Sequence, residues 1–72
     1  MDVYNDECSE ILRRFLERRI SHSQCLAALD AALSDAVLRL DPENLRAVQD
    51  MIRFNYDVIA AEMKRRGPSK TN

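Results

Sequence analysis

Apolar residues recur at intervals of three or four positions in the first part of the chain, between Tyr4 and Phe15. This spacing places them along one face of an α-helix. Acidic residues stand in the early turns and arginines follow later, an order that matches the dipole of a helix. We therefore predict a first helix over about residues 4–18, with an apolar stripe that consists of Tyr4, Cys8, Ile11, Leu12 and Phe15.

A second helix is predicted to begin after a capping box. In Ser21-His22-Ser23-Gln24, the Ser21 hydroxyl can accept a hydrogen bond from the Gln24 amide, and the Gln24 side chain can accept one from the Ser21 amide. Apolar residues then recur at helical spacing, and the alanines between them raise the helix propensity. We predict a helix over about residues 22–40, with a stripe formed by Leu26, Leu29, Leu33, Val37 and Leu40.

The clearest boundary in the chain is Asp41-Pro42-Glu43. Aspartate is a favourable N-cap, proline is favoured at the first helical position, and glutamate complements the positive N-terminus of a helix. The helical spacing then continues to three basic residues, and Gly67 and Pro68 are typical of the end of a helix. We predict a third helix over about residues 42–66 and a frayed tail over residues 67–72.

These three segments predict an all-α fold with a single domain over residues 1–72, built as a small three-helix antiparallel bundle, that is, a helical hairpin plus an N-terminal helix. The sequence holds one glycine and two prolines, so few turns are expected. A chain of 72 residues struggles to bury a sufficient core by itself. We therefore expect dimerisation to complete the bundle.

The predicted third helix is apolar on two opposite faces, whereas a helix on the surface of a small monomer needs only one apolar stripe. At about 100° per residue, one face runs from Leu45 to Met63. A contact between Leu40 and Leu45 across the cap orients this face toward the second helix. Asn55 lies on a polar seam between the faces and is expected to be exposed. The second face, our candidate interface, consists of Ala47, Met51, Phe54, Val58 and Ala61.

Three ways of covering this second face are open. The first helix of the same chain could cover it, which would place the third helix in the middle of a three-helix monomer. A second copy could cover it in a two-fold dimer with antiparallel third helices, which we favour, and a different protein is the third option. The third helix also outruns the second by roughly two turns. Its end, near residues 61–66, is therefore not expected to be fully covered by the hairpin.

The net charge of −1 argues against broad electrostatic capture of nucleic acid or of an anionic membrane. The segment from Arg13 to Arg19 is locally basic, so a nucleic-acid-binding regulator that uses the first helix is the alternative function. The simpler interpretation is that these arginines solvate the outer side of that helix. No segment approaches the roughly 20 apolar residues of a membrane span, and the acidic start does not resemble a signal peptide.

The reactive side chains do not gather into a predicted site. Cys8 and Cys25 are expected to be reduced core residues, which fits a reducing compartment. His22 and Cys25 supply two ligands where a structural zinc site needs four. There is no glycine-rich phosphate loop, and so small a bundle has little room for a pocket of about 300 Å³. We therefore predict no enzyme activity, no metal and no cofactor.

The predicted function is that of a non-enzymatic protein–protein interaction module, which acts as a regulator, adaptor or inhibitor in the cytoplasm. We expect it to form a homodimer through the third helix and to bind another protein. A minor subunit of an enzyme is a further interpretation, which these residues do not separate from the first.

Overall fold

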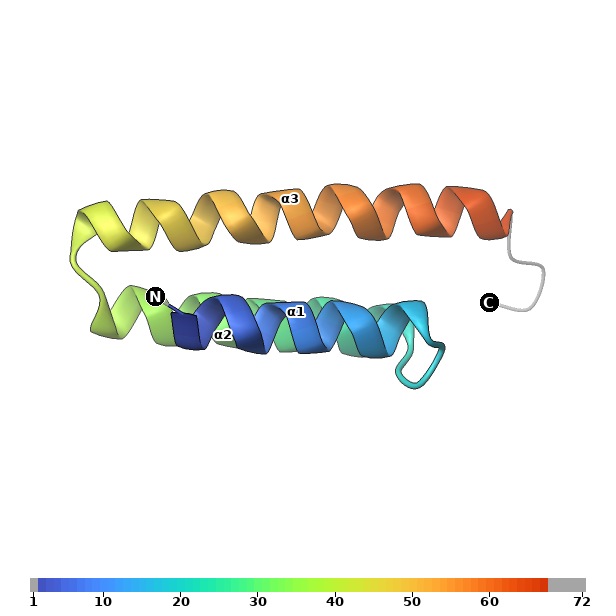
Figure 1. Cartoon of the computed structure of the whole chain (residues 1–72), viewed down its shortest axis with the longest axis horizontal. Helices are drawn as coiled ribbons and strands as arrows, with labels where there is room; N and C mark the ends of the chain where they lie inside the picture. Colours follow the sequence, from blue (N-terminus) through green and yellow to red (C-terminus); the bar gives the residue numbers. More distant parts are fainter. Residues whose placement is uncertain (1, 68–72) are drawn as a thin grey trace.

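Three α-helices, packed against one another, make up the protein in a computed structural model that describes residues 2–67. They are α1 (Asp2–Leu16), α2 (His22–Arg39) and α3 (Pro42–Arg66), and residues 2–67 contain no β-strand. As Figure 1 shows, α1 and α3 run in the same direction and α2 runs in the opposite direction. The prediction of an all-α fold with three helices is confirmed.

The core lies between the three helices. Because α2 buries mostly small residues, neighbouring helices can approach its backbone closely. Its buried face is therefore rotated away from part of the predicted stripe, and Val37 is 53% exposed. Near the start of α1 and the end of α2, the Tyr4 hydroxyl donates a hydrogen bond to Asp35 Oδ2 at 2.7 Å and joins the two helices. The buried apolar residues are Tyr4, Cys8, Ile11, Phe15, Cys25, Leu29, Ala32, Ala36, Val48, Ile52 and Ile59.

The starts of α2 and α3 differ in how they are capped. The predicted capping box is confirmed: the Gln24 amide donates to Ser21 Oγ at 3.1 Å, and the Ser21 amide donates to Gln24 Oε1 at 2.8 Å. Asp41 occupies the N-cap of α3, but its side chain makes no hydrogen bond to the helix backbone. It accepts one from the side-chain amide of Asn44 instead. The N-cap position of Asp41 was therefore predicted correctly, but the hydrogen bond from the Asn44 side chain was not predicted.

The end of α3 is marked by its glycine. Gly67 has a φ of 85°, a conformation that favours glycine, and its amide donates to the Lys64 carbonyl at 3.1 Å. Residues 68–72, which make up most of the predicted frayed tail, lie outside the described residues.

The end of α1 lies two residues before its predicted position. The prediction missed it because an arginine, rather than the usual glycine, stands just after the helix in the left-handed conformation. The Arg18 amide donates to the Phe15 carbonyl at 3.0 Å, and the Arg19 amide donates to the Arg14 carbonyl at 2.8 Å. This pair of bonds is a Schellman motif, which needs a residue in the left-handed conformation. That residue is Arg18, with a φ of 64°. The sequence carries no glycine at this helix end, so the usual signal is missing.

The variant Arg18→Gly is expected to stabilise the fold by about 1 kcal/mol. A side chain in the left-handed conformation costs about 1–2 kcal/mol, and the greater freedom of glycine in the unfolded chain offsets part of the gain. The measurement is the urea midpoint followed by circular dichroism. Arg19→Gly is the matched control, because the φ of Arg19 is not positive. An unchanged or lower midpoint for Arg18→Gly would contradict the prediction.

Candidate interaction surface

The predicted interface residues lie together on the outer surface of α3, and the fold covers them only in part. Phe54, at the centre, is 65% exposed, and Ala47 and Ala61 are also exposed. Met51 and Val58, on the flank of the face, are half-buried. The other helices of the same chain therefore cover one edge of this face and leave its middle open.

The burial of Asn55 explains why the middle of the face stays open. Asn55 is 6% exposed and shares the buried side of α3 with three apolar residues. On a helix with about 100° per residue, the buried direction lies between the predicted stripe that runs from Leu45 to Met63 and the seam that carries Asn55. The expectation that Asn55 is exposed is therefore wrong. Helices α1 and α2 both contact α3, and the side of α3 that they bury includes Asn55 and apolar residues of the Leu45–Met63 stripe.

The C-terminal turn of α3 is held by the end of α1. The guanidinium group of Arg66 lies over the Phe15 ring, 4.5 Å from its centroid, and Arg66 Nη2 donates to the Phe15 carbonyl at 3.0 Å. Glu62 accepts hydrogen bonds from Arg65 and Arg66, which lower the pKa of its carboxyl to about 2. This end was not expected to be fully covered by the hairpin, and Ala61, Lys64 and Arg65 are indeed exposed. The long side chain of Arg66 nevertheless reaches α1.

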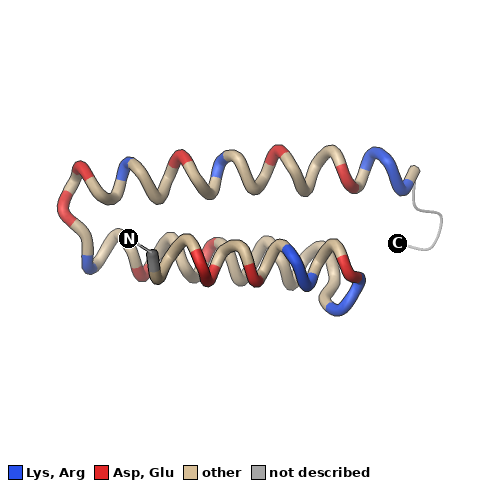
Figure 2. Tube along the Cα trace, in the orientation of Figure 1, with Lys and Arg blue, Asp and Glu red and all other residues tan. Residues whose placement is uncertain are grey.

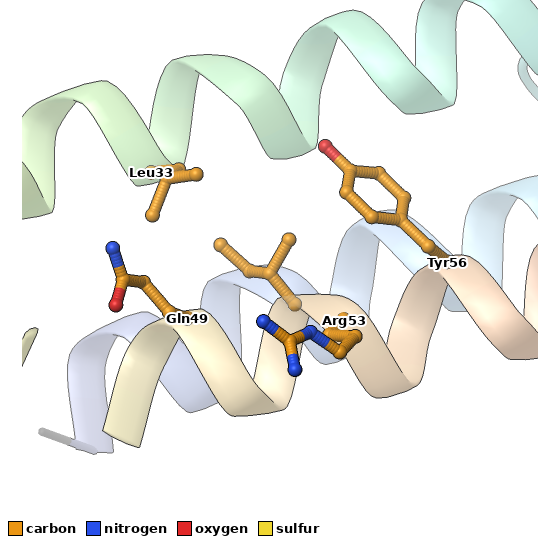
Figure 3. A pocket seen from close by; sticks show the side chains of 5 residues that line it. Leu33, Gln49, Arg53 and Tyr56 are labelled. Atoms are coloured by element: carbon orange, nitrogen blue, oxygen red, sulfur yellow. The ribbon is translucent and has the colours of Figure 1, made fainter. Parts of the chain in front are cut away.

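A shallow groove of about 310 Å³ lies between α2 and α3. Its volume exceeds what we expected of so small a bundle. In Figure 3, Leu33 enters it from α2, Gln49 and Arg53 lie along α3, and Tyr56 points its hydroxyl toward α2; Ile52 also lines it. Desolvation is the main cause of the raised pKa of Tyr56, so this phenol stays protonated at neutral pH. The lining therefore offers hydrogen-bonding groups and one cation rather than a general base.

The cysteines are free, and both are fully buried. Desolvation raises the pKa of the Cys8 and Cys25 thiols, which keeps them protonated. Because the thiolate is the reactive form of cysteine, these are poor nucleophiles. The expectation of two reduced core cysteines agrees with this placement.

His22, the only histidine, packs near an aromatic ring rather than in a cluster of ligands. Its ring centroid lies 6.1 Å from that of Phe15, and the two rings are tilted by 47°. Among residues 2–67, no group of three or more histidine, cysteine, aspartate or glutamate side chains is placed to hold a metal ion. Among these residues, His22 and Cys25 therefore have no third ligand beside them.

The arginines of α1 are largely neutralised by neighbouring carboxylates. Arg13 Nη2 lies 2.6 Å from Glu10 Oε2 and its Nη1 lies 3.2 Å from Glu17 Oε2, while Arg14 Nε lies 3.0 Å from Glu10 Oε2. Hydrogen bonds, first of all from Arg13, lower the pKa of Glu10 and keep it ionised. These pairs reduce the positive potential that a phosphate backbone would meet.

Two charged residues at the ends of the α3 face were missed in the sequence analysis. Glu43 and Arg65 are both exposed, and each stands 11 positions from Phe54 along the helix. Their equal spacing from the central aromatic residue is the signal that could have identified them. Leu38, on α2, is the most exposed large apolar residue of the described chain at 85%, and it lies on the side of α2 opposite the buried residues of that helix.

None of the described helices is long and apolar enough to cross a lipid bilayer. No protein-family model matches this chain, and no curated protein sequence or solved structure is significantly similar to it. The function is therefore inferred from the geometry of the chain itself.

Proposed function

We propose that this protein is a non-enzymatic helical interaction module, which uses the outer face of α3 to bind another helix, in a homodimer and in complexes with another protein. The observation that carries the proposal is the 65% exposure of Phe54 in the middle of an apolar face. Burying one such side chain contributes about 1.5–3 kcal/mol, and a two-fold dimer buries two of them. In the monomer Phe54 stays exposed, so the free energy of burying its ring is gained only on association.

The form of the face supports a helical partner. Small residues, Ala47 and Ala61, stand on either side of the bulky Phe54, so a second helix can approach while the ring enters a space between its side chains. Met51 and Val58 continue the apolar surface toward the core. Such an arrangement, an aromatic anchor within an apolar strip, is common at the centre of protein interfaces.

The role in the cell that we favour is that of a regulator, adaptor or inhibitor in the cytoplasm. The two buried thiols support a reducing compartment, because disulfides are common in small domains of oxidising compartments. The groove between α2 and α3 supports a non-enzymatic role, since the described residues that line it include no carboxylate, histidine or thiol. The alternative, a nucleic-acid-binding regulator that uses α1, has less support, because Arg13 and Arg14 are paired with carboxylates.

The variant Phe54→Asp tests this function by light scattering coupled to size exclusion. We expect the unaltered protein to be a dimer at tens of micromolar and Phe54→Asp to be a monomer with unchanged helix content by circular dichroism. A charge in the middle of an apolar interface has no partner and must be desolvated, which strongly disfavours association.

The matched control is Leu38→Asp, which places the same charge at another exposed apolar position, on α2 rather than α3. We expect this variant to remain dimeric. If the unaltered protein is monomeric at tens of micromolar, the homodimer is wrong. If Phe54→Asp unfolds a monomer, Phe54 belongs to the core of a single chain, and the proposed face is wrong.

A further inference from the structure

The outer face of α3 has a symmetric order of residues around Phe54. Ala47 and Ala61 stand seven positions before and after it, and Glu43 and Arg65 stand 11 positions before and after it. Seven and 11 residues are close to two and three whole turns of a helix, so all five residues lie along one line on its surface. This line reads acid, alanine, phenylalanine, alanine, base, and the four residues around Phe54 are exposed together with it.

Such a line is complementary to itself when it is turned around. If two copies of α3 pack antiparallel with one Phe54 facing the other, Ala47 of each copy faces Ala61 of the other. Glu43 of each copy then faces Arg65 of the other, because both pairs of residue numbers have the same sum. In a parallel pair, like charges would face each other at both ends, which disfavours association.

We infer that the partner of this face is a second copy of the chain, bound in an antiparallel two-fold dimer that is centred on Phe54 and oriented by two Glu43–Arg65 ion pairs. The inference rests on the homodimer of the proposed function and adds the direction and the register of its two α3 helices. A two-fold interface uses the same surface on both copies, which this line of residues satisfies.

The shape of the side chains fits the same register. Side chains on a helix lean toward its N-terminus, so in an antiparallel pair the two Phe54 rings lean away from each other. Each ring then enters the hole bordered by residues 54, 57, 58 and 61 of the other copy, as in knobs-into-holes packing. Ala61 supplies the room for the ring on one side of this hole. In a parallel pair, both rings would lean the same way at the same level and compete for one space.

The charges at the two ends of α3 are available for this pairing. Figure 2 shows acidic residues where α3 begins and basic residues where it ends. Within residues 2–67, Glu43 forms no ion pair. Arg65 binds Glu62 through Nε and Nη2, at 2.9 and 2.7 Å, so its Nη1 can still donate to a second carboxylate.

The polar seam beside the face does not favour this register. By the same sum of residue numbers, Asp50 of each copy comes next to Asp57 of the other and Arg46 comes next to Lys64, while Arg53 comes next to both Arg53 and Asp57. These side chains project about 40–100° away from the line of Phe54, at the exposed edge of the contact, where each ion contact contributes little. The charges that favour the antiparallel direction are therefore those in line with Phe54. The residues of this seam are Arg46, Asp50, Arg53, Asp57 and Lys64.

The test is a charge swap, read out as the dissociation constant from sedimentation equilibrium at low ionic strength. Glu43→Lys and Arg65→Glu are each expected to weaken the dimer by about tenfold, because two contacts per dimer change from attraction to repulsion. The double variant Glu43→Lys/Arg65→Glu restores both contacts with reversed sign. We expect its dissociation constant to return to within about threefold of the original value.

Lys64→Glu is the matched control, because it makes the same change of charge in the last turn of α3 but off the line of Phe54. It is not expected to weaken the dimer, and circular dichroism shows whether any variant has lost helix content. If the unaltered protein dimerises and Phe54→Asp does not, but the double variant stays as weak as the single ones, the register is wrong and the proposed function stands. If the unaltered protein does not dimerise, both are wrong.

Discussion

Replacing Phe15 with alanine is expected to destabilise the fold by about 3–5 kcal/mol, which is the usual cost of removing a buried phenylalanine ring. Phe15 is fully buried at the point where α1, the start of α2 and the end of α3 meet. The loss includes the contact with Arg66, whose guanidinium group would no longer lie over a ring. A domain of this size is stable by roughly 4–10 kcal/mol, so we expect this variant to lose about a third or more of its stability.

The measurement is urea unfolding followed by circular dichroism, at a low micromolar concentration that keeps association out of the equilibrium. Phe54→Ala makes the same chemical change at a ring that is 65% exposed, and we expect it to cost less than about 1 kcal/mol. Phe15→Leu retains most of the buried volume and is expected to cost about 1–1.5 kcal/mol. Equal losses for the two alanine variants would contradict the burial of Phe15.

The contrast between these two phenylalanines also indicates how much could be predicted from the sequence. Helical periodicity assigned Phe15 to the inward stripe of the first helix and Phe54 to a separate second face, and the structure buries the former and exposes the latter. Local patterns of this kind are read from residues a few positions apart. The capping box at Ser21 and the boundary at Pro42 were found in the same way.

The orientation of α3 was not predictable from such local patterns. The stripe from Leu45 to Met63 was assigned to the second helix, but the cover of the second face was left open, and a polar seam with an asparagine is normally assigned to solvent. The observed orientation depends on contacts between residues far apart in sequence, such as that of Arg66 with Phe15, 51 positions away. The exposure of Phe54 follows from this orientation. The candidate interface was therefore predictable as a set of residues, but its partial coverage was not.

Asn55→Leu is expected to raise the free energy of unfolding by about 1–3 kcal/mol. Asn55 is 6% exposed, and within residues 2–67 its Nδ2 has no hydrogen-bond partner. A buried donor left without an acceptor costs about 1–3 kcal/mol, because its bonds to water are lost on folding and are not replaced. Leucine has a branched side chain of similar shape without this donor, and it adds apolar area among Val48, Ile52 and Ile59.

The urea midpoint of Asn55→Leu decides this prediction, and Asn55→Asp is the control of similar size. The aspartate variant places a carboxylate in the same position, and we expect it to be destabilised at neutral pH and partly recovered toward pH 4. Burial raises the pKa of a carboxyl, so this variant binds a proton more readily when folded and gains stability as the pH falls. If Asn55→Leu lowers the midpoint instead, the larger side chain does not fit, and the asparagine is required by the packing of the three helices rather than tolerated by it.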